Sequence, residues 1–252
     1  MKRSYLYLII VLLVVVALVI VFTNKPQQEA ARPVLRVGTD AAYEPFEYID
    51  EDGNFAGFDI ELITMIAEEM GRELELQNVQ WDGIIPGLMN GNYDCLISAM
   101  TITEERMKQI NFSDPYFTIK QAIVVREDDY SITGPADLAG KTIAVQNGTT
   151  GDLYASQIEG VRMKRFDTNP QAIQELLNKN ADAAVMDDLV AYQAIAKMKG
   201  LRMIEIADAE VENYGIGVKK GNDELLAEIN KALATLRENG KLDALIEKYR
   251  SM

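Results

Sequence analysis

The sequence predicts an α/β protein of two lobes joined by two strands. Short apolar segments with strand periodicity alternate with amphipathic helical segments through most of the chain. That pattern favours sheets of parallel strands with helices on both faces. Two extended segments, residues 118–126 and 211–219, are long enough to run between lobes. We therefore expect one lobe from residues 34–118 and 214–252, and a second lobe from residues 119–213 inserted into it.

The first lobe is expected to begin with a strand at residues 34–38, which ends at a glycine. A hairpin follows, with Asp52, Gly53 and Asn54 as its turn. Asp59 is placed to cap the next helix, in which apolar residues recur at helical spacing until a glycine ends it. The next elements are a strand, a short helix and a buried strand, at residues 73–79, 83–90 and 94–98.

The middle of the chain continues the alternation of strands and helices. We expect strands at residues 142–145, 162–166, 181–186 and 201–206. We expect helices at residues 151–158, 170–177 and 188–198. Two amphipathic helices close the chain, each with leucine and isoleucine on one face, and Asn239 and Gly240 separate them.

The first thirty residues differ from the rest of the chain. Lys2 and Arg3 precede residues 6–22, a run of 17 residues without a charged side chain. A secretory signal core has ~7–15 apolar residues and a spanning helix ~17–25, so we expect residues 1–22 to be a membrane anchor or uncleaved signal. The leading cations hold the N-terminus in the cytoplasm. The remaining chain is then exported and tethered to the outer face of the cell membrane through a linker at residues 23–33, or released if the signal is cleaved.

The composition excludes several classes of protein. Histidine is absent, which excludes His-dependent nucleophile triads and His-ligated metal sites. Cys95 is the one cysteine and lies in an apolar run, so we expect a buried thiol, no disulfide and no metal site. Residues 32–252 carry 22 basic and 38 acidic residues, a formal charge of −16. Nucleic acid and anionic lipid surfaces are therefore poor partners.

A series of short motifs runs through the exported part of the chain. They are Val37-Gly38-Thr39-Asp40, Tyr43-x-Pro45-Phe46, Gly57-Phe58-Asp59-Ile60, Trp81-Asp82-Gly83-Ile84, Ser98-Ala99-Met100-Thr101, Phe112-Ser113-Asp114-Pro115, Gln146-Asn147-Gly148-Thr149 and Tyr214-Gly215-Ile216-Gly217. In this order and spacing they make residues 34–250 resemble the family 3 extracellular solute-binding proteins, the receptors of polar amino acid ABC importers. The resemblance implies a type II periplasmic-binding-protein fold, a ligand cleft between the lobes, and no cofactor. It also implies a monomer that binds a free amino acid and serves an ABC permease with its ATPase subunits.

The resemblance places the ligand carboxylate near Arg106. A guanidinium offers a planar fork for two carboxylate oxygens, although a surface arginine is an equal expectation from the residues alone. Thr149 and Thr150 begin a helix whose free backbone N–H groups can hold the same anion, or form only a capping turn. Ser98 and Thr101 offer neutral hydrogen bonds at a strand end.

The resemblance places the cationic parts of the ligand near two acids. Asp187 follows an apolar strand where the family binds the ligand ammonium; capping the next helix is the alternative, although Asp188 could do so instead. Asp40 lies where the family binds the distal group or the ammonium, and a solvated acid is the alternative. Tyr43 and Trp81 correspond to the aromatic walls around the ligand, with core packing as the alternative.

The predicted contacts favour a cationic ligand. Glu44 adds negative charge near Asp40, and no lysine or histidine occurs among the contacts, so arginine or lysine is expected. Gln146 and Met186 stand where glutamine-binding relatives tend to carry basic residues, which weakens a glutamine assignment. The complete set of predicted ligand contacts is Asp40, Tyr43, Glu44, Trp81, Ser98, Ala99, Thr101, Arg106, Gln146, Thr149, Thr150 and Asp187.

Two other functions are compatible with the same fold. Some relatives are cyclohexadienyl dehydratases, which act on prephenate or arogenate with a carboxyl group as general acid. Asp40, Glu44 or Asp187 could serve in that role, but none has proton transfer as its only explanation, so we predict a receptor and no enzyme activity. A sensor domain usually continues into a second membrane helix, whereas the sequence ends at Met252.

Overall fold

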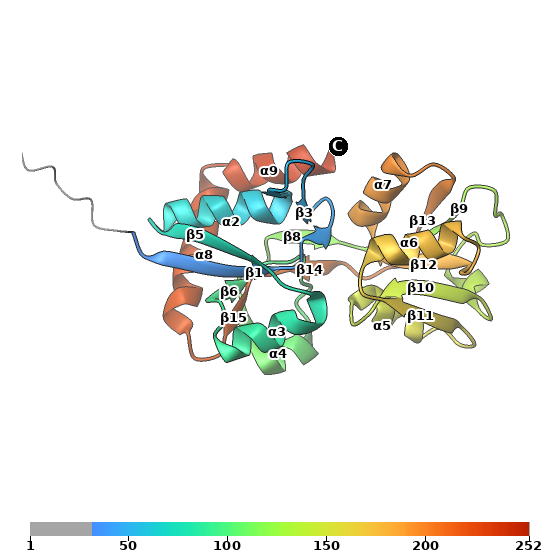
Figure 1. Cartoon of the computed structure of the whole chain (residues 1–252), viewed down its shortest axis with the longest axis horizontal. Helices are drawn as coiled ribbons and strands as arrows, with labels where there is room; N and C mark the ends of the chain where they lie inside the picture. The colour runs from blue at the N-terminus through green and yellow to red at the C-terminus, as the bar shows by residue number, and fades with distance from the viewer. Residues whose placement is uncertain (1–31, 252) are drawn as a thin grey trace, which may run out of the picture. The chain divides into compact units, whose positions relative to one another are not determined.

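The computed structural model describes residues 32–251. The predicted anchor at residues 1–22 and most of the linker at residues 23–33 lie outside the described residues. From Pro33 onward the chain forms one compact unit, which contains two separate five-stranded sheets (Figure 1). Within residues 32–251, no helix combines the length and apolar character needed to cross a membrane.

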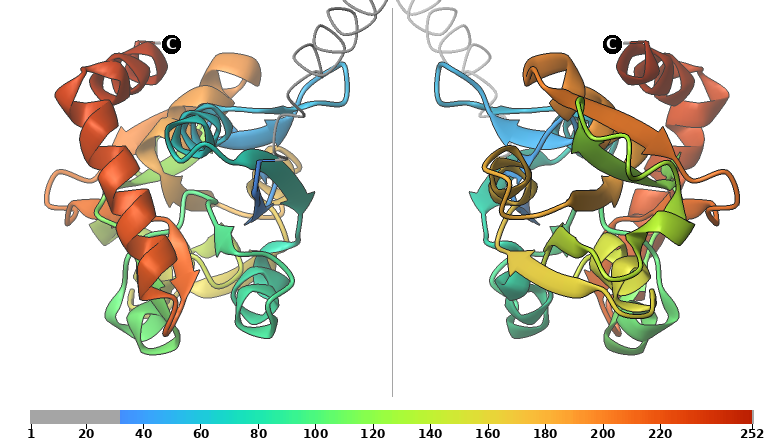
Figure 2. Two further views of the ribbon diagram at one scale, coloured as in Figure 1. Left: turned by 90° about the vertical axis from the view of Figure 1, so that its left-hand side faces the viewer. Right: turned by 90° about the vertical axis from the view of Figure 1, so that its right-hand side faces the viewer.

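The first lobe is built on the sheet of order β5-β1-β6-β15-β7. Its strands are β1 (Val34–Thr39), β5 (Glu73–Asn78), β6 (Cys95–Leu96), β7 (Ile110–Phe112) and β15 (Gly217–Lys219). Its helices are α2 (Phe58–Glu69), α3 (Trp81–Asn90), α4 (Glu104–Gln109), α8 (Asp223–Glu238) and α9 (Lys241–Arg250). The two C-terminal helices α8 and α9 pack on α2, and α9 ends at the C-terminus (Figure 2).

The second lobe is built on the sheet of order β11-β10-β12-β9-β13. Its strands are β9 (Gln121–Arg126), β10 (Thr142–Gln146), β11 (Arg162–Phe166), β12 (Ala183–Asp187) and β13 (Leu201–Glu205). Its helices are the short η1 (Pro135–Leu138), α5 (Thr150–Ser156), α6 (Asn169–Leu177) and α7 (Asp188–Lys197). Helices α6 and α7 lie on one side of this sheet, with α5 on the other (Figure 1).

Two strands connect the lobes. β8 (Phe117–Ile119) pairs antiparallel with β14 (Glu212–Tyr214). Lys120 separates β8 from β9, and residues 215–216 separate β14 from β15. The two predicted extended segments are therefore each divided between the connection and one of the large sheets.

The prediction of parallel sheets is wrong for part of each sheet. β5, β1 and β6 are parallel, as are β11, β10 and β12. β15 is antiparallel to β6, and β9 is antiparallel to β12. The reason is that β9 and β15 each continue from a connecting strand, so they enter their sheets directly from the other lobe and need no crossover helix.

Other local predictions differ in detail. A small sheet of β2 (Ala42–Tyr43), β3 (Glu47–Ile49) and β4 (Phe55–Ala56) contains the predicted hairpin. α4 and β7 were not predicted, because a six-residue helix is too short to show an apolar face in sequence. Cys95 is fully buried and unpaired, as predicted.

An aromatic cluster fixes the connecting strands to the first lobe. The ring of Phe46 lies 5.0 Å from that of Tyr214 and 5.1 Å from that of Phe117, both pairs edge to face. Phe58 of α2 lies 4.8 Å from Phe117. All four rings are buried. Burial of one such ring stabilises the fold by about 1.5–3 kcal/mol, so both connecting strands are held firmly against α2 and the hairpin.

Candidate functional site

A small cavity lies where the strand ends of the two lobes meet. Its lining consists of Asp40, Tyr43, Glu47, Trp81, Ser98, Ala99, Thr101, Arg106, Gln146, Thr149, Thr150 and Asp187. The structure thus brings together every predicted contact except Glu44, and it adds Glu47. The lining holds three carboxyl groups and one guanidinium, so its charge is dominated by acids.

Arg106 is held rigidly at one end of the cavity. Its side chain is only 9% exposed, one terminal nitrogen donates to the Thr101 carbonyl at 2.7 Å, and the other donates to the Gly148 carbonyl at 3.2 Å. The guanidinium lies 5.1 Å from the centre of the Trp81 ring, within cation–π range. Burial lowers the pKa of Arg106 while the nearby Asp187 raises it, and an arginine so placed stays charged. It can present the fork needed for a carboxylate.

Of the acids that line the cavity, Asp187 accepts the most hydrogen bonds from other side chains. One carboxylate oxygen accepts from the Tyr43 hydroxyl at 2.5 Å and from the Tyr214 hydroxyl, and the other accepts from Nε2 of Gln121 at 2.6 Å. Burial raises the pKa of Asp187 to about 6, because these hydrogen bonds only partly offset the loss of solvation. The backbone of Asp187 precedes α7, but its side chain makes no capping bond. The carboxylate therefore faces the cavity, and sequence reasoning missed its partners Gln121 and Tyr214.

A second group of acids lies at the strand end of β1. The hydroxyl of Ser98 accepts from the Asp40 backbone N–H at 3.0 Å and donates to the Glu47 carboxylate at 2.9 Å. The other oxygen of Glu47 is buried without a hydrogen-bond partner. Burial raises the pKa of Asp40 to about 6, and burial together with Asp59 raises that of Glu47 well above its usual value. A cation in the cavity would relieve both acids.

The loop after β6 is shaped by Asp59. Ala99 has a φ of 41°, which is unusual for a residue other than glycine. Its backbone N–H donates to the Asp59 carboxylate at 2.7 Å, and the Tyr116 hydroxyl donates to the same oxygen at 2.8 Å. The prediction that Asp59 caps α2 is wrong, since Gly57 precedes the helix and Asp59 is fully buried within its first turn. Asp59 instead positions the backbone that lines the cavity.

The threonines at the second lobe's edge have divided roles. Thr149 accepts from the Asp152 backbone N–H at 3.2 Å and donates to the Gln146 carbonyl at 2.9 Å, so its hydroxyl serves as a helix cap. The hydroxyls of Thr101 and Thr150 lie 3.4 Å apart, one from each lobe. The turn at Thr149 and Thr150 is therefore compatible with both predicted roles, as a helix cap and as part of the ligand cavity.

The placement of Glu44 in the site is wrong. Its carboxylate accepts from Nζ of Lys197 at 2.5 Å and from Nε2 of Gln193 at 3.2 Å, outside the cavity lining. Tyr43 pairs directly with Glu47 across the β2–β3 hairpin. Directly paired residues project to the same face of a sheet, so Glu47 faces the cavity beside Tyr43 while Glu44 faces away.

The comparisons with known proteins agree with this geometry. The sequence pattern of the bacterial extracellular solute-binding proteins, family 3, matches residues 35–252. The chain belongs to this family. A solved mutant of ArgBP from T. maritima is 45% identical, with a TM-score of 0.82, and the match covers 87% of this chain and 96% of that one. An ancestral arginine-binding protein bound to arginine is 43% identical, with a TM-score of 0.83 and coverage of 87% and 99%. The predicted two-lobe periplasmic-binding-protein fold is therefore confirmed.

Sequence relatives point to the same class of protein. The arginine-binding extracellular protein ArtP of Bacillus subtilis is 32% identical over 251 residues, which cover 98% of each chain. An ancestral amino acid-binding protein described as a precursor of cyclohexadienyl dehydratase is 38% identical, with a TM-score of 0.81. As a member of a family of solute-binding proteins, this chain is a solute-binding protein. Among residues 32–251, no group of three or more acidic, Cys or His side chains is placed to hold a metal ion.

Proposed function

We propose that this protein is the receptor of an ABC importer and captures arginine or lysine. The observation that carries the proposal is the charge of the cavity, where Asp40, Glu47 and Asp187 surround a single cation, Arg106. An amino acid with a neutral side chain adds one charge of each sign and leaves the excess of acid uncompensated. A cationic side chain reduces that excess, which favours arginine or lysine over glutamine.

The polar groups suggest how the ligand is held. The ligand carboxylate would receive the fork of Arg106, and its ammonium would bind the Asp187 carboxylate. The distal cation would reach Asp40 and the unpartnered oxygen of Glu47, with Trp81 packed along the aliphatic chain. Each charged ligand group then has a charged partner, as a desolvated site requires.

Binding requires the lobes to separate first. The cavity has a volume of about 10 Å³, while room for a single water molecule requires ~10–15 Å³ on the same measure. Two contacts join the lobes across the cleft and would break on opening: the Tyr43 hydroxyl donates to Asp187, and Lys197 donates to Glu44. We propose that residues 34–118 with 214–252 move against residues 119–213 and close around the amino acid.

The remaining proposals concern location and partners. The N-terminal residues 1–22 would tether a monomeric receptor to the outer face of the membrane. There the ligand-bound lobes would dock on the permease, whose ATPase subunits supply the energy. Family membership supports an extracytoplasmic binding component.

A fluorescence titration tests the proposed ligand. Trp81 is the only tryptophan of the chain and lies against Arg106, so its emission reports on the cleft. The chain, refolded once to remove carried-over ligand, is titrated with each of the twenty amino acids and with prephenate. We expect a saturable change with arginine or lysine at micromolar or lower concentration.

The other outcomes separate the parts of the proposal. Saturation by a different amino acid would retain the receptor and refute the cationic ligand. Absence of any amino acid binding, with prephenate consumed, would refute the receptor and establish the dehydratase. Arg106→Ala serves as the matched control, because it removes the carboxylate partner and should abolish the response.

A further inference from the structure

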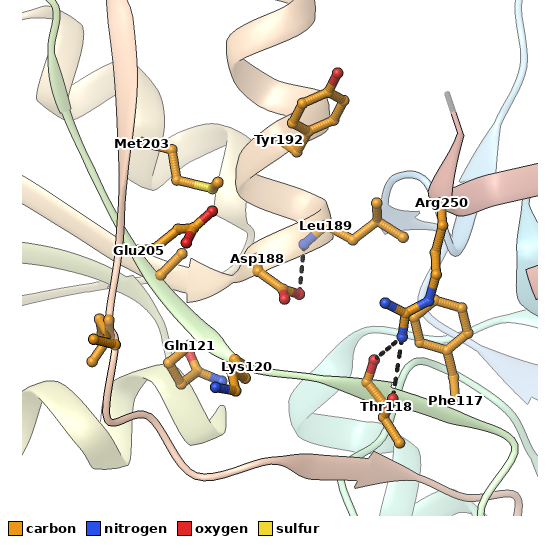
Figure 3. A pocket seen from close by; sticks show the side chains of 13 residues that line it. Phe117, Thr118, Lys120, Gln121, Asp188, Leu189, Tyr192, Met203, Glu205 and Arg250 are labelled. Carbon is orange, nitrogen blue, oxygen red and sulfur yellow. Dashed lines mark hydrogen bonds between the residues drawn. The ribbon is translucent and has the colours of Figure 1, made fainter. Parts of the chain in front are cut away.

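A second cavity, of about 410 Å³, lies beside the connecting strands, and no predicted ligand contact lines it (Figure 3). Its walls come from both lobes. Thr118 and Arg250 belong to the first lobe, and Asp188 and Tyr192 of α7 belong to the second. Small-molecule pockets have volumes of about 300–1,000 Å³, so this cavity is large enough for a ligand of amino acid size.

The charged groups of this cavity are not paired with one another. They are Lys120, Arg250, Asp188 and Glu205. Among residues 32–251, none of these four forms a salt bridge. Arg250 donates to the backbone oxygen and hydroxyl of Thr118, at 3.0 and 3.1 Å, and Asp188 accepts from the Leu189 N–H at 2.8 Å. Arg250 also lies 4.9 Å from the centre of the Phe117 ring, and Asp188 accepts from backbone groups alone, while the Lys120 and Glu205 side chains make no hydrogen bond within residues 32–251, so charged groups of both signs keep donors and acceptors for a ligand.

We propose that this second cavity binds a free amino acid with an apolar side chain. A zwitterion brings one group of each sign, so its carboxylate can bind Lys120 and Arg250 while its ammonium binds Asp188 and Glu205. A simple anion or cation would leave the opposite pair uncompensated. Leu189, Tyr192 and Met203 provide the apolar wall, and Figure 3 shows Tyr192 and Met203 on facing elements, α7 and β13.

The second cavity is connected to the cleft through Gln121. This side chain lines the second cavity, is only 3% exposed, and donates to the Asp187 carboxylate at 2.6 Å. Asp187 and Asp188 are consecutive, and one lines each cavity. An occupant that contacts both lobes stabilises the arrangement in which the cleft residues meet. Occupancy of the second cavity therefore strengthens amino acid binding in the cleft. By thermodynamic linkage, amino acid binding in the cleft strengthens binding in the second cavity by the same factor.

Equilibrium dialysis of the full chain in detergent micelles tests this site. The probes are labelled L-phenylalanine and L-leucine, each with and without saturating unlabelled L-arginine. We expect one saturable probe site per chain that arginine does not displace. Lys120→Met should weaken probe binding about tenfold, the value of one charge-assisted hydrogen bond. Ala207→Trp, at an exposed position of the cavity lining, should abolish it.

The controls keep this site separate from the cleft. Ala196→Trp makes the same change at an exposed position of α7 outside the cavity lining, and it should bind the probe like the wild type. Absence of saturable probe binding, displacement by arginine, or wild-type binding in Ala207→Trp would each overturn the proposal. A failure of arginine alone to bind would overturn the proposed cleft ligand, while the dialysis without arginine would still decide the second site.

Saturating L-phenylalanine should also strengthen arginine binding several-fold, and an unchanged affinity would refute the connection through Gln121.

Discussion

Replacing Asp187 by asparagine should have opposite effects on stability and on binding. Burial raises the pKa of Asp187 from 3.8 to about 6. Between these values the folded protein holds a proton that the unfolded chain has lost, so stability falls as the pH rises from about 4 to about 6. Each pKa unit corresponds to about 1.4 kcal/mol, so the ionised group costs the folded state up to ~3 kcal/mol above pH 7. Asp187→Asn removes that cost.

The geometry around the new amide can be retained. Its oxygen can accept from Tyr43 and Tyr214, as the carboxylate does. Gln121 can rotate its amide so that Oε1, which is buried without a partner, accepts from the new NH₂ group. That rotation gives up the 3.1 Å hydrogen bond from Gln121 Nε2 to Glu212, so the substitution exchanges one hydrogen bond for removal of the buried charge and of its repulsion with Glu212.

Denaturant unfolding without ligand at pH 5 and pH 8 measures the stability effect. The variant should be the more stable protein at pH 8 and keep about half of that advantage at pH 5. Calorimetric titration with arginine at pH 8 should show at least about thirtyfold weaker binding, because a buried charge pair loses a partner. Asp208→Asn is the matched control, since Asp208 is exposed, and it should change neither quantity. Equal stability of Asp187→Asn and wild type at pH 8, or undiminished affinity, would refute the reasoning.

Three further predictions concern the cleft and the fold. Arg106→Lys keeps the charge but loses the planar fork, so arginine affinity measured by calorimetry should fall at least about tenfold; an unchanged affinity would exclude the proposed carboxylate contact. Gly57→Ala should reduce unfolding free energy by about 3 kcal/mol, because Gly57 has a φ of 120° and a Cβ would lie 2.2 Å from the Phe46 carbonyl oxygen. The control Gly53→Ala, where φ is 84° with open space around the Cβ, should cost about 1 kcal/mol, and equal losses would contradict this. Burial raises the pKa of Asp40 to about 6, so the ionisation of Asp40 by itself should raise arginine affinity about tenfold from pH 5 to pH 8. An arginine affinity that does not change with pH would show that the charge of Asp40 does not contribute to binding.

Sequence reasoning predicted most of the residues that line the cleft cavity, because they follow strand ends and carry motif signals. It failed where the answer depended on which way a side chain faces. Glu44 and Glu47 are both acids near Tyr43, and only the pairing of Tyr43 with Glu47 in the hairpin decides between them. That signal is available in the sequence once the hairpin register is fixed by its turn.

The partners of Asp187 were beyond sequence reasoning for a different reason. Gln121 is the first residue of β9 and Tyr214 the last of β14, 66 and 27 residues away from Asp187 in the chain. No periodicity or motif links such positions: Gln121 faces Asp187 because β9 pairs antiparallel with β12, a pairing that was not predicted, and Tyr214 reaches Asp187 from the connecting strand β14. The directions of β9 and β15 were missed for the same reason, since strand direction depends on the path between lobes.

The aromatic cluster around Phe46 has a consequence for local unfolding. Because Phe117 and Tyr214 pack there, the amide hydrogens of β8 and β14 should exchange with solvent together with those of α2. The second lobe contributes no ring to this cluster, so its sheet can open without exposing the connecting strands. Hydrogen exchange should therefore show two cooperative units. The connecting strands should be protected together with the first lobe, and the second lobe should exchange as a separate unit.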